Sequence, residues 1–451
     1  MAAPILGAEA VRKKIDVQYL ELGMYVAELD RPWLGTPFLF QGFEIRSEAE
    51  LLELKRLCKW VHVDSADAHR AMSAPRRVAV PTAPARPQPA IQTEAEQRVA
   101  REILKIINQP RAQPVYTDKC EIEQEIPTAR EHVSVARTLI YQILDDVRTG
   151  KNIDSISAKR VVGALAESVI RNPDALTCFI QLKNKDEYTA QHSMRVCILA
   201  LAFGRHLGLD RETLEMLGAG ALLHDVGKMK VPNEILNKPA SLTDYEFSLM
   251  KSHVPRGVEL LERMPGIPRP AIEVARCHHE RYAGSGYISG LTGDQIGFFG
   301  MIGGIVDCYD AVTSDRAYRA GMSAHAALKQ MYEWRGRDFH PGLVEQFIQC
   351  MGIYPIGSVV ELNTGEIAVV VTMNRVRRLK PRVTLVLNAN CAPYNTPVTV
   401  DLMNHKTSDG RACEIDRVLE PGMYGIDPVR YLPVIDPTRL LRPAAHAATR
   451  A

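Results

Sequence analysis

Five histidines carry most of the chemistry that this sequence suggests. They fall within one region of the chain, whereas the rest of the thirteen are dispersed: His192, His224, His253, His278 and His279. A single histidine is more often a hydrogen-bonded core or surface residue than a ligand, but neutral imidazoles combined with carboxylates bind divalent ions. Two such ions, about 3.5–4 Å apart, supply the activated water and the positive charge that phosphodiester hydrolysis needs at neutral pH. The joint pattern therefore favours a two-metal hydrolytic site.

The segment "LLHDVGK" places an imidazole directly beside a carboxylate. His224 and Asp225 end an apolar helical stretch, and adjacent side chains on a helix point about 100° apart, so both can reach one cavity. Lys228 follows on the same face, where its ammonium can meet a phosphate oxygen. An isolated His-Asp pair is usually a surface ion pair. Its position between an apolar helix and a proline-containing loop favours a site here.

A second segment, "CHHERYAGSGYIS" at 277–289, has adjacent histidines followed by an acid and a glycine-rich turn. It is compatible with a metal-binding loop and with two buried histidines followed by a turn.

The elements that must position these residues are helical. Ala136, Ile140 and Ile143 share one helix face, and this texture predicts a helical domain over 128–352. Asp210 is a predicted N-cap, and "TDYE" at 243–246 is a predicted capping box. Pro255 is expected to interrupt its helix just after His253.

Other textures flank this domain. Residues 1–70 read as a small α/β domain, 71–127 as a Pro/Ala-rich linker and lead-in, and 353–451 as a small β module with a disordered tail. The N-terminal aromatic residues favour a small core over an interaction surface: Trp33, Phe38, Phe40 and Phe43. The fold class is thus a mainly α-helical catalytic domain between two small modules.

Composition excludes several broad classes. With 55 basic and 53 acidic side chains the net charge is +2, so no global field favours a nucleic acid polymer or a membrane surface. The nine scattered cysteines contain no CxxC pair, which favours a reducing cytoplasm over a disulfide framework. No uncharged apolar run reaches the roughly 20 residues of a membrane helix. We expect a cytoplasmic protein.

Five motifs in order resemble the HD-GYP branch of the HD-domain phosphohydrolases, bacterial phosphodiesterases that degrade cyclic di-GMP. They are "YTAQHSMRV", "LLHDVGKMKVPNEILNKP", "LTDYEFSLMKSHVPRGVELL", "HHERYAGSGY" and "DCYDAVTSDRAYR", between 183 and 327. The stretch "GMYVAELDRPWLGTPFLFQGF" also resembles the small domain of unknown function that often precedes HD-GYP domains in bacteria.

The resemblance implies roles for individual residues. The implied metal ligands are His192, His224, Asp225, His253, His278, His279 and Asp307, with Asp225 also as the bridging, catalytic carboxylate. Lys228 is implied in catalysis and phosphate binding, and Asp310 in orienting a ligand. The implied substrate-binding residues are Lys228, Gly284, Gly286, Tyr287, Arg316 and Arg319. The implied cofactors are two divalent ions, Fe or Mn, with Mg or Ni as alternatives.

Three positions depart from the family pattern. Tyr188 stands where some members have a glutamate that supports a third metal, which favours two metals here. Ala283 replaces an expected aspartate that would pin the loop, and Ile288 replaces an expected proline. Loss of a partner that supports a ligand typically lowers metal affinity or activity about 10- to 100-fold. The loss of the proline is expected to loosen the turn by about 1 kcal/mol.

Three functions compete on this basis. The leading one is hydrolysis of cyclic di-GMP to pGpG, and onward to GMP. The second is a weakly active or inactive cyclic di-GMP receptor or scaffold that signals through protein partners such as diguanylate cyclases. The third is an HD phosphohydrolase for another nucleotide. A homodimer is compatible with the sequence.

Overall fold

The computed structural model describes residues 12–31, 36, 38, 43–64, 116–182, 188–315, 320–407 and 410–435. The chain divides into two compact units, Met1–Arg86 and Pro87–Ala451. The proline-rich part of the expected linker and the expected C-terminal tail lie outside the described residues.

The N-terminal unit is a small antiparallel sheet with one helix. Its strand order is β1-β4-β2-β3, and its core includes Phe43 with Phe38 packed against it. A capping box between Ser47 and Glu50 fixes the start of α1. The elements are β1 (Arg12–Asp16), β2 (Tyr25–Leu29), β3 (Phe43–Glu44), α1 (Glu48–Leu57) and β4 (Trp60–Asp64), together with the short helix η1 (Val17–Tyr19).

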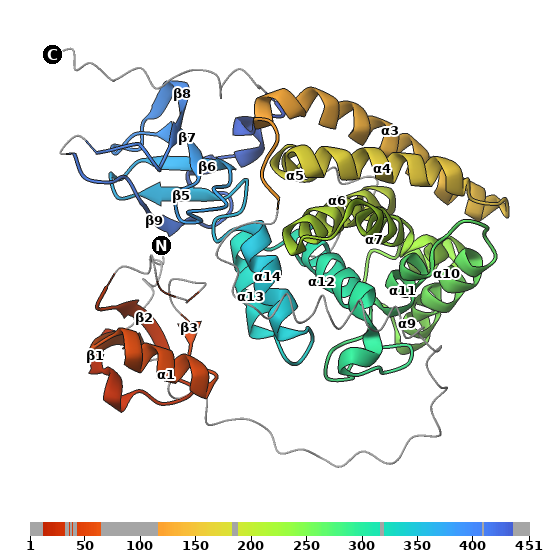
Figure 1. The fold of residues 1–451 in the computed structure, drawn as a ribbon, viewed down its shortest axis with the longest axis horizontal. Helices are drawn as coiled ribbons and strands as arrows, with labels where there is room; N and C mark the ends of the chain where they lie inside the picture. Colours follow the sequence, from red (N-terminus) through yellow and green to blue (C-terminus); the bar gives the residue numbers. More distant parts are fainter. Residues whose placement is uncertain are drawn as a thin grey trace, which may run out of the picture. The chain divides into compact units, whose positions relative to one another are not determined.

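The second unit begins with a helical domain, drawn from orange through cyan in Figure 1. Its first half contains α3 (Ile122–Thr149), α4 (Ser155–Arg171), α5 (Pro173–Ile180), α6 (Tyr188–Leu207), α7 (Arg211–Leu223), η2 (Val226–Lys230) and α8 (Asn233–Leu236). Its second half contains α9 (Asp244–Lys251), α10 (His253–Glu262), α11 (Arg269–Cys277), η3 (Gly293–Ile296), α12 (Phe298–Thr313), α13 (Ala324–Glu333) and α14 (Pro341–Met351).

Local signals fix several of these boundaries. Asp210 caps α7 by accepting from the amide of Thr213 at 2.8 Å, and Thr243 forms the expected capping box with Glu246. The interruption expected after His253 falls one residue earlier, at Ser252, so α10 begins at His253. Pro255 then lies in the first turn of α10, where its missing N–H has no intrahelical partner to lose.

The first helix begins before the expected boundary at residue 128. Helix α3 starts at Ile122, because Glu121 and Gln124 form a capping box and Glu125 is anchored. The buried carboxylate of Glu125 pairs with Arg171 at 2.7 Å and accepts from the hydroxyl of Ser168 at 2.7 Å. This ion pair fastens α3 to α4, beside which it runs (Figure 1).

The chain then forms a five-stranded antiparallel sheet of order β8-β7-β6-β5-β9. Its strands are β5 (Val359–Leu362), β6 (Ile367–Thr372), β7 (Arg382–Leu387), β8 (Pro393–Asp401) and β9 (Ile415–Val418), followed by η4 (Met423–Gly425) and η5 (Pro428–Tyr431). Every residue of β6 is buried, because its alternate side chains enter two separate apolar clusters. Arg375 joins this module to the helices through ion pairs with Asp174 at 2.5 Å and Asp118 at 2.7 Å.

Candidate metal centre and active site

Four mutually packed helices bring the predicted ligands together. Helix α6 packs on α7, α7 on α11, α11 on α12, and α12 on α6. His192 comes from α6 and Asp307 from α12, while the other ligands stand at or directly beside helix ends: His224, Asp225, His253, His278 and His279. All of these side chains are buried except that of His279, which is partly exposed.

Asp225 lies between two groups of possible metal-binding atoms. Its Oδ2 is 3.5 Å from His192 Nε2 and 3.3 Å from His224 Nε2. Its Oδ1 is 3.3 Å from His253 Nε2 and 3.7 Å from His278 Nε2. One group therefore combines His192, His224 and Asp225, and the other Asp225, His253, His278 and His279. A carboxylate with one oxygen toward each group has the orientation of a bridging ligand.

Backbone carbonyl groups orient three of the imidazole rings. His224 Nδ1 is 2.8 Å from the carbonyl oxygen of Ala221, and His253 Nδ1 is 2.7 Å from that of Met250. His278 makes the same contact with Ala275 at 2.9 Å. When Nδ1 donates to a carbonyl oxygen, the lone pair of Nε2 points the other way and is available to a metal. Each ring thus presents Nε2 to the cluster.

Two buried atoms at the centre lack hydrogen-bond partners among the described residues, namely His224 Nε2 and Asp225 Oδ1. A buried polar atom without a partner is costly, and a bound cation satisfies both a lone pair and a carboxylate oxygen. Asp307 adds a second carboxylate, with its Oδ1 3.0 Å from His192 Nε2 and 3.7 Å from His224 Nε2. The donor set therefore fits divalent metal ions.

The two halves of the cluster differ electrostatically. Burial by itself lowers the pKa of His224, but the charges and side-chain contacts of Asp225 and Asp307 together outweigh it and raise that pKa to about 10. The pKa of His192 is also raised, because its contacts with carboxylates outweigh burial. Burial lowers the pKa of His278 to about 3, with a further contribution from the charge of His224. The pKa values of His253 and His279 are lowered too, chiefly by burial. One half is thus rich in negative charge and the other in neutral imidazole.

Asp310 supports His192 from outside the cluster. Its Oδ2 is 2.7 Å from His192 Nδ1, and Arg195 contacts the same carboxylate through Nε at 2.6 Å and Nη2 at 2.9 Å. All three side chains are buried. A carboxylate that accepts from Nδ1 fixes the tautomer of a histidine and makes Nε2 a stronger ligand.

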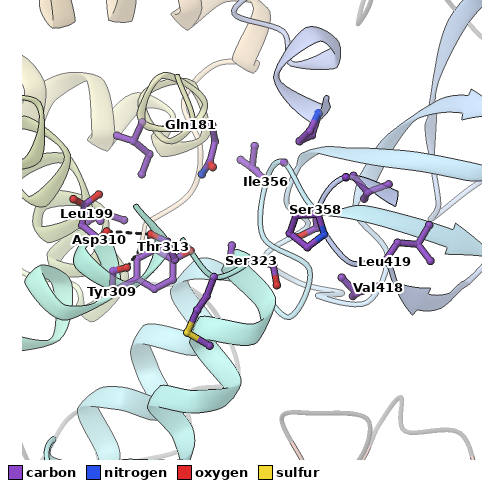
Figure 2. A pocket seen from close by; sticks show the side chains of 18 residues that line it. Gln181, Leu199, Tyr309, Asp310, Thr313, Ser323, Ile356, Ser358, Val418 and Leu419 are labelled. Carbon is purple, nitrogen blue, oxygen red and sulfur yellow. Dashed lines mark hydrogen bonds between the residues drawn. The ribbon is translucent and has the colours of Figure 1, made fainter. Parts of the chain in front are cut away.

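The C-terminal module faces Tyr309 and Asp310 of α12 across a cavity. The cavity has a volume of about 180 Å³. Tyr309 and Asp310 form one wall, and Ser358 and Leu419 form the other (Figure 2). The module thus borders the helix that carries Asp307 and Asp310.

Lys228 lies beside the predicted metal-binding atoms. Its ammonium group contacts Asp225 Oδ2, three residues earlier in the chain. Burial would raise the pKa of Asp225, but the charges of Lys228, His224 and His253, together with the side-chain contact to His224, outweigh it and hold that pKa well below its usual range. Lys228 therefore supplies positive charge next to the oxygen that faces His192 and His224.

The loop after His279 is held by Glu280, whose role sequence reasoning missed. The buried Glu280 carboxylate accepts from the backbone amides of Ile288 at 3.2 Å, Ser289 at 2.8 Å and Leu291 at 3.0 Å. Glu280 thus pins the loop, which was the role expected of the aspartate absent at Ala283. Ile288 uses its amide in this network, and a proline there would remove one donor.

The predicted substrate loop contacts the predicted metal ligand His279. A Cβ atom at Gly286 would stand 2.4 Å from the Cα of Glu280, so only glycine fits this approach. Gly284 adopts a φ of 82° in the same turn. The ring of Tyr287 stacks on that of His279, with centroids 4.5 Å apart.

Two predicted residues are not placed. Arg316 and Arg319 lie outside the described residues, as does the side chain of Tyr188. Sequence reasoning also missed Arg195, for which a signal existed: it follows His192 by three residues and so shares its helix face.

Family models match most of the chain. An HD domain matches residues 179–343, a domain of unknown function, DUF3391, matches 12–157, and a KOW domain associated with HD domain matches 359–420. No helix among the described residues is long and apolar enough to span a membrane.

Curated proteins match as well. The chain is 35% identical to the cyclic di-GMP phosphodiesterase PA4108 of Pseudomonas aeruginosa, over 90% of this chain and 91% of that one. It is 34% identical to the cyclic di-GMP phosphodiesterase response regulator RpfG of Xanthomonas campestris, over 42% of this chain and 51% of that one. It is 35% identical to the 3′3′-cGAMP-specific phosphodiesterase 2 of Vibrio cholerae, over 36% of this chain and 31% of that one.

A solved structure, the HDG"Y"P protein Bd1817 of Bdellovibrio bacteriovorus, aligns with a TM-score of 0.42 at 14% identity, over 75% of this chain and 98% of that one. The relationship to the Pseudomonas phosphodiesterase extends over nearly the whole of both chains, and the HD domain match includes His192, His224, Asp225 and Asp307. The chain belongs to the HD-GYP family of HD-domain phosphodiesterases.

Proposed function

We propose that this protein hydrolyses cyclic di-GMP to pGpG, and onward to GMP, at a site that holds two divalent ions. The observation that carries this proposal is the pair of ligand groups that share Asp225, with one carboxylate oxygen toward each group. We expect Fe or Mn in these positions, with Mg or Ni as alternatives. Bound ions supply activation of water and positive charge at the phosphoryl oxygens.

The chain's own residues complete the chemistry. Water adds to phosphorus and the 3′ oxygen leaves with a proton, so the cyclic ring opens to a linear dinucleotide. In the structure the ammonium of Lys228 neutralises Asp225. The two ligand groups would hold divalent ions, which would supply positive charge to Asp225, and Lys228 would then be able to contact a phosphate oxygen of the substrate. Asp310 keeps His192 in place, and Glu280 holds the loop that carries Tyr287.

We choose cyclic di-GMP as the substrate because of the relative that aligns over nearly the whole chain. The Pseudomonas protein, which is named for cyclic di-GMP, aligns over 90% of this chain, whereas the Vibrio protein named for 3′3′-cGAMP aligns over 36% of it. Arg316 and Arg319 are proposed to bind the phosphate or guanine. Protein partners such as diguanylate cyclases, a homodimer and a cytoplasmic location stay predictions.

The test is turnover by protein purified without oxygen and supplied with Mn²⁺ or Fe²⁺. Cyclic di-GMP and 3′3′-cGAMP are incubated separately, and the products are separated by chromatography. We expect pGpG from cyclic di-GMP, faster conversion of cyclic di-GMP than of 3′3′-cGAMP, and no product from Asp225→Asn. Glu234→Gln, at an exposed acid in α8, is the matched control and should retain full activity. Micromolar binding of cyclic di-GMP without turnover would overturn the proposal in favour of a receptor.

A further inference from the structure

Helix α9 is unusual in that none of its eight residues is buried. Its position is nevertheless well fixed, because the Thr243 capping box starts it and Lys238 pairs with Glu246 at 2.6 Å. The helix also leads directly, through Ser252, to the predicted ligand His253. The position of α9 is therefore fixed by its cap, its ion pair and its link to His253, and not by fully buried apolar side chains.

A chain of ring contacts runs from Phe247 of α9, through Tyr287, to the predicted metal ligand His279. The rings of Phe247 and Tyr287 are 5.9 Å apart between centroids and nearly perpendicular, at 78°. Tyr287 in turn stacks on His279, at 4.5 Å and 27°. Phe247 is 44% exposed, so it offers an apolar surface at the border of the site rather than filling a core.

Lys251, at the end of α9, adds a positive charge to this border. Its Nζ lies 4.9 Å from the ring centroid of Phe247 and 5.9 Å from that of Tyr287. Within the described ranges of the chain, no carboxylate pairs with this ammonium group. A cation over two aromatic rings and without a counterion is well suited to an anion that arrives from solution.

We propose that Phe247 and Lys251 form a subsite for the part of the dinucleotide that is not being cleaved. A cyclic dinucleotide carries two flat purines and two phosphates. When one phosphate lies at the metal-binding atoms, a base and the second phosphate must be bound at the border of the site. Phe247 stacks a guanine base, and Lys251 binds the second phosphate. This inference rests on the proposed function, because it assigns positions within the same substrate.

The first test changes the aromatic ring alone. Phe247→Leu keeps an apolar side chain on α9 but cannot stack, whereas Phe247→Trp keeps a stacking surface. Loss of base stacking on an aromatic ring is expected to raise the KM for cyclic di-GMP about 5- to 150-fold in Phe247→Leu, with kcat within about twofold. Phe247→Trp should keep KM close to the wild-type value. Bis(p-nitrophenyl) phosphate has neither a purine nor a second phosphate, so its rate of hydrolysis at saturating concentration should be equal in all three proteins.

The second test changes the charge. Lys251→Gln should raise the KM for cyclic di-GMP about tenfold at low salt and by less at high salt, because ions screen the lost attraction. Tyr245→Ala is the matched control: Tyr245 is 73% exposed on the same helix, and its substitution should leave both substrates unaffected. The melting temperature and metal content are measured for every variant.

The outcomes separate this inference from the proposed function. If wild-type protein converts cyclic di-GMP but Phe247→Leu has an unchanged KM, the subsite is wrong and the function stands. Equal losses for both substrates in Phe247→Leu, or a loss of metal, would show that the ring only supports the fold, which also overturns the subsite. If wild-type protein hydrolyses bis(p-nitrophenyl) phosphate but no cyclic dinucleotide, the proposed function itself fails.

Discussion

Replacing Asp310 with asparagine should weaken metal binding through His192 and destabilise the fold through Arg195. Asp310 contacts His192 Nδ1 at 2.7 Å and Arg195 Nε at 2.6 Å, and all three residues are at most 4% exposed. The loss of a charged acceptor behind a metal-binding histidine lowers metal affinity about 10- to 100-fold, or about 1.4–2.7 kcal/mol. The same change leaves a buried guanidinium without its partner, which costs about 3–5 kcal/mol in the free energy of unfolding.

A double variant separates these two effects. In Arg195→Met with Asp310→Asn, no buried charge is left unpaired, so most of the free energy of unfolding should return. Metal affinity should stay low, because His192 Nδ1 still lacks its carboxylate partner. Metal affinity is measured by competition with a chelator of known affinity, and stability by denaturant unfolding of the metal-free protein. Glu234→Gln serves as the control for removal of an acid. Wild-type metal affinity in Asp310→Asn, or its full recovery in the double variant, would refute this reasoning.

Three further predictions follow from the described contacts. Glu280→Gln leaves one carbonyl oxygen for three amides, so hydrogen exchange at Ser289 and Leu291 should speed up as the loop loses about 1–3 kcal/mol of protection; unchanged exchange would contradict the role of Glu280. Ile288→Pro removes one of these donors and should lower the melting temperature and the activity, whereas a rise in either would mean that proline stiffens this loop as it was expected to from sequence. Burial raises the pKa of Glu125, but the contacts with Arg171 and Ser168 outweigh it, so this pKa is lower in the folded protein than in the unfolded one. Its stabilising contribution is therefore fully present above about pH 4.3 and is lost as pH falls through the folded pKa. Glu125→Gln should accordingly reduce the free energy of unfolding more at pH 7 than at pH 3, and an equal loss at both values would contradict the assignment.

Much of the helical domain could be predicted from sequence because its signals are local. The cap at Asp210 and the capping box at Thr243 depend on residues three positions apart, and both are present in the structure. The start of α3 was harder to predict. Its capping box joins Glu121 and Gln124, without the Ser or Thr that usually marks such a box in a sequence, and its anchor, the pairing of Glu125 with Arg171, spans 46 residues.

In the candidate site, too, some features could be predicted from local sequence and others depend on packing. Ordered motifs indicated which histidines and aspartates belong together. They gave no information on the two oxygens of Asp225, whose directions depend on how α7, α10 and α11 pack. Glu280 was missed because the amides it binds lie 8 to 11 residues later, in a loop whose conformation the sequence does not specify. Ala283 stands where an aspartate acceptor was expected, and the sequence therefore suggested that the loop had lost its hydrogen-bond acceptor. The acceptor is Glu280, which directly follows the two histidines.

The most direct test of the central claim is a titration of metal-free protein with Mn²⁺, in which pGpG formation from cyclic di-GMP is followed against equivalents of metal per chain. Two ligand groups that share Asp225 predict that the rate rises until about two equivalents are bound and then stays constant. A rate that is complete at one equivalent would contradict the two-metal site. The absence of pGpG at every ratio would contradict the account as a whole.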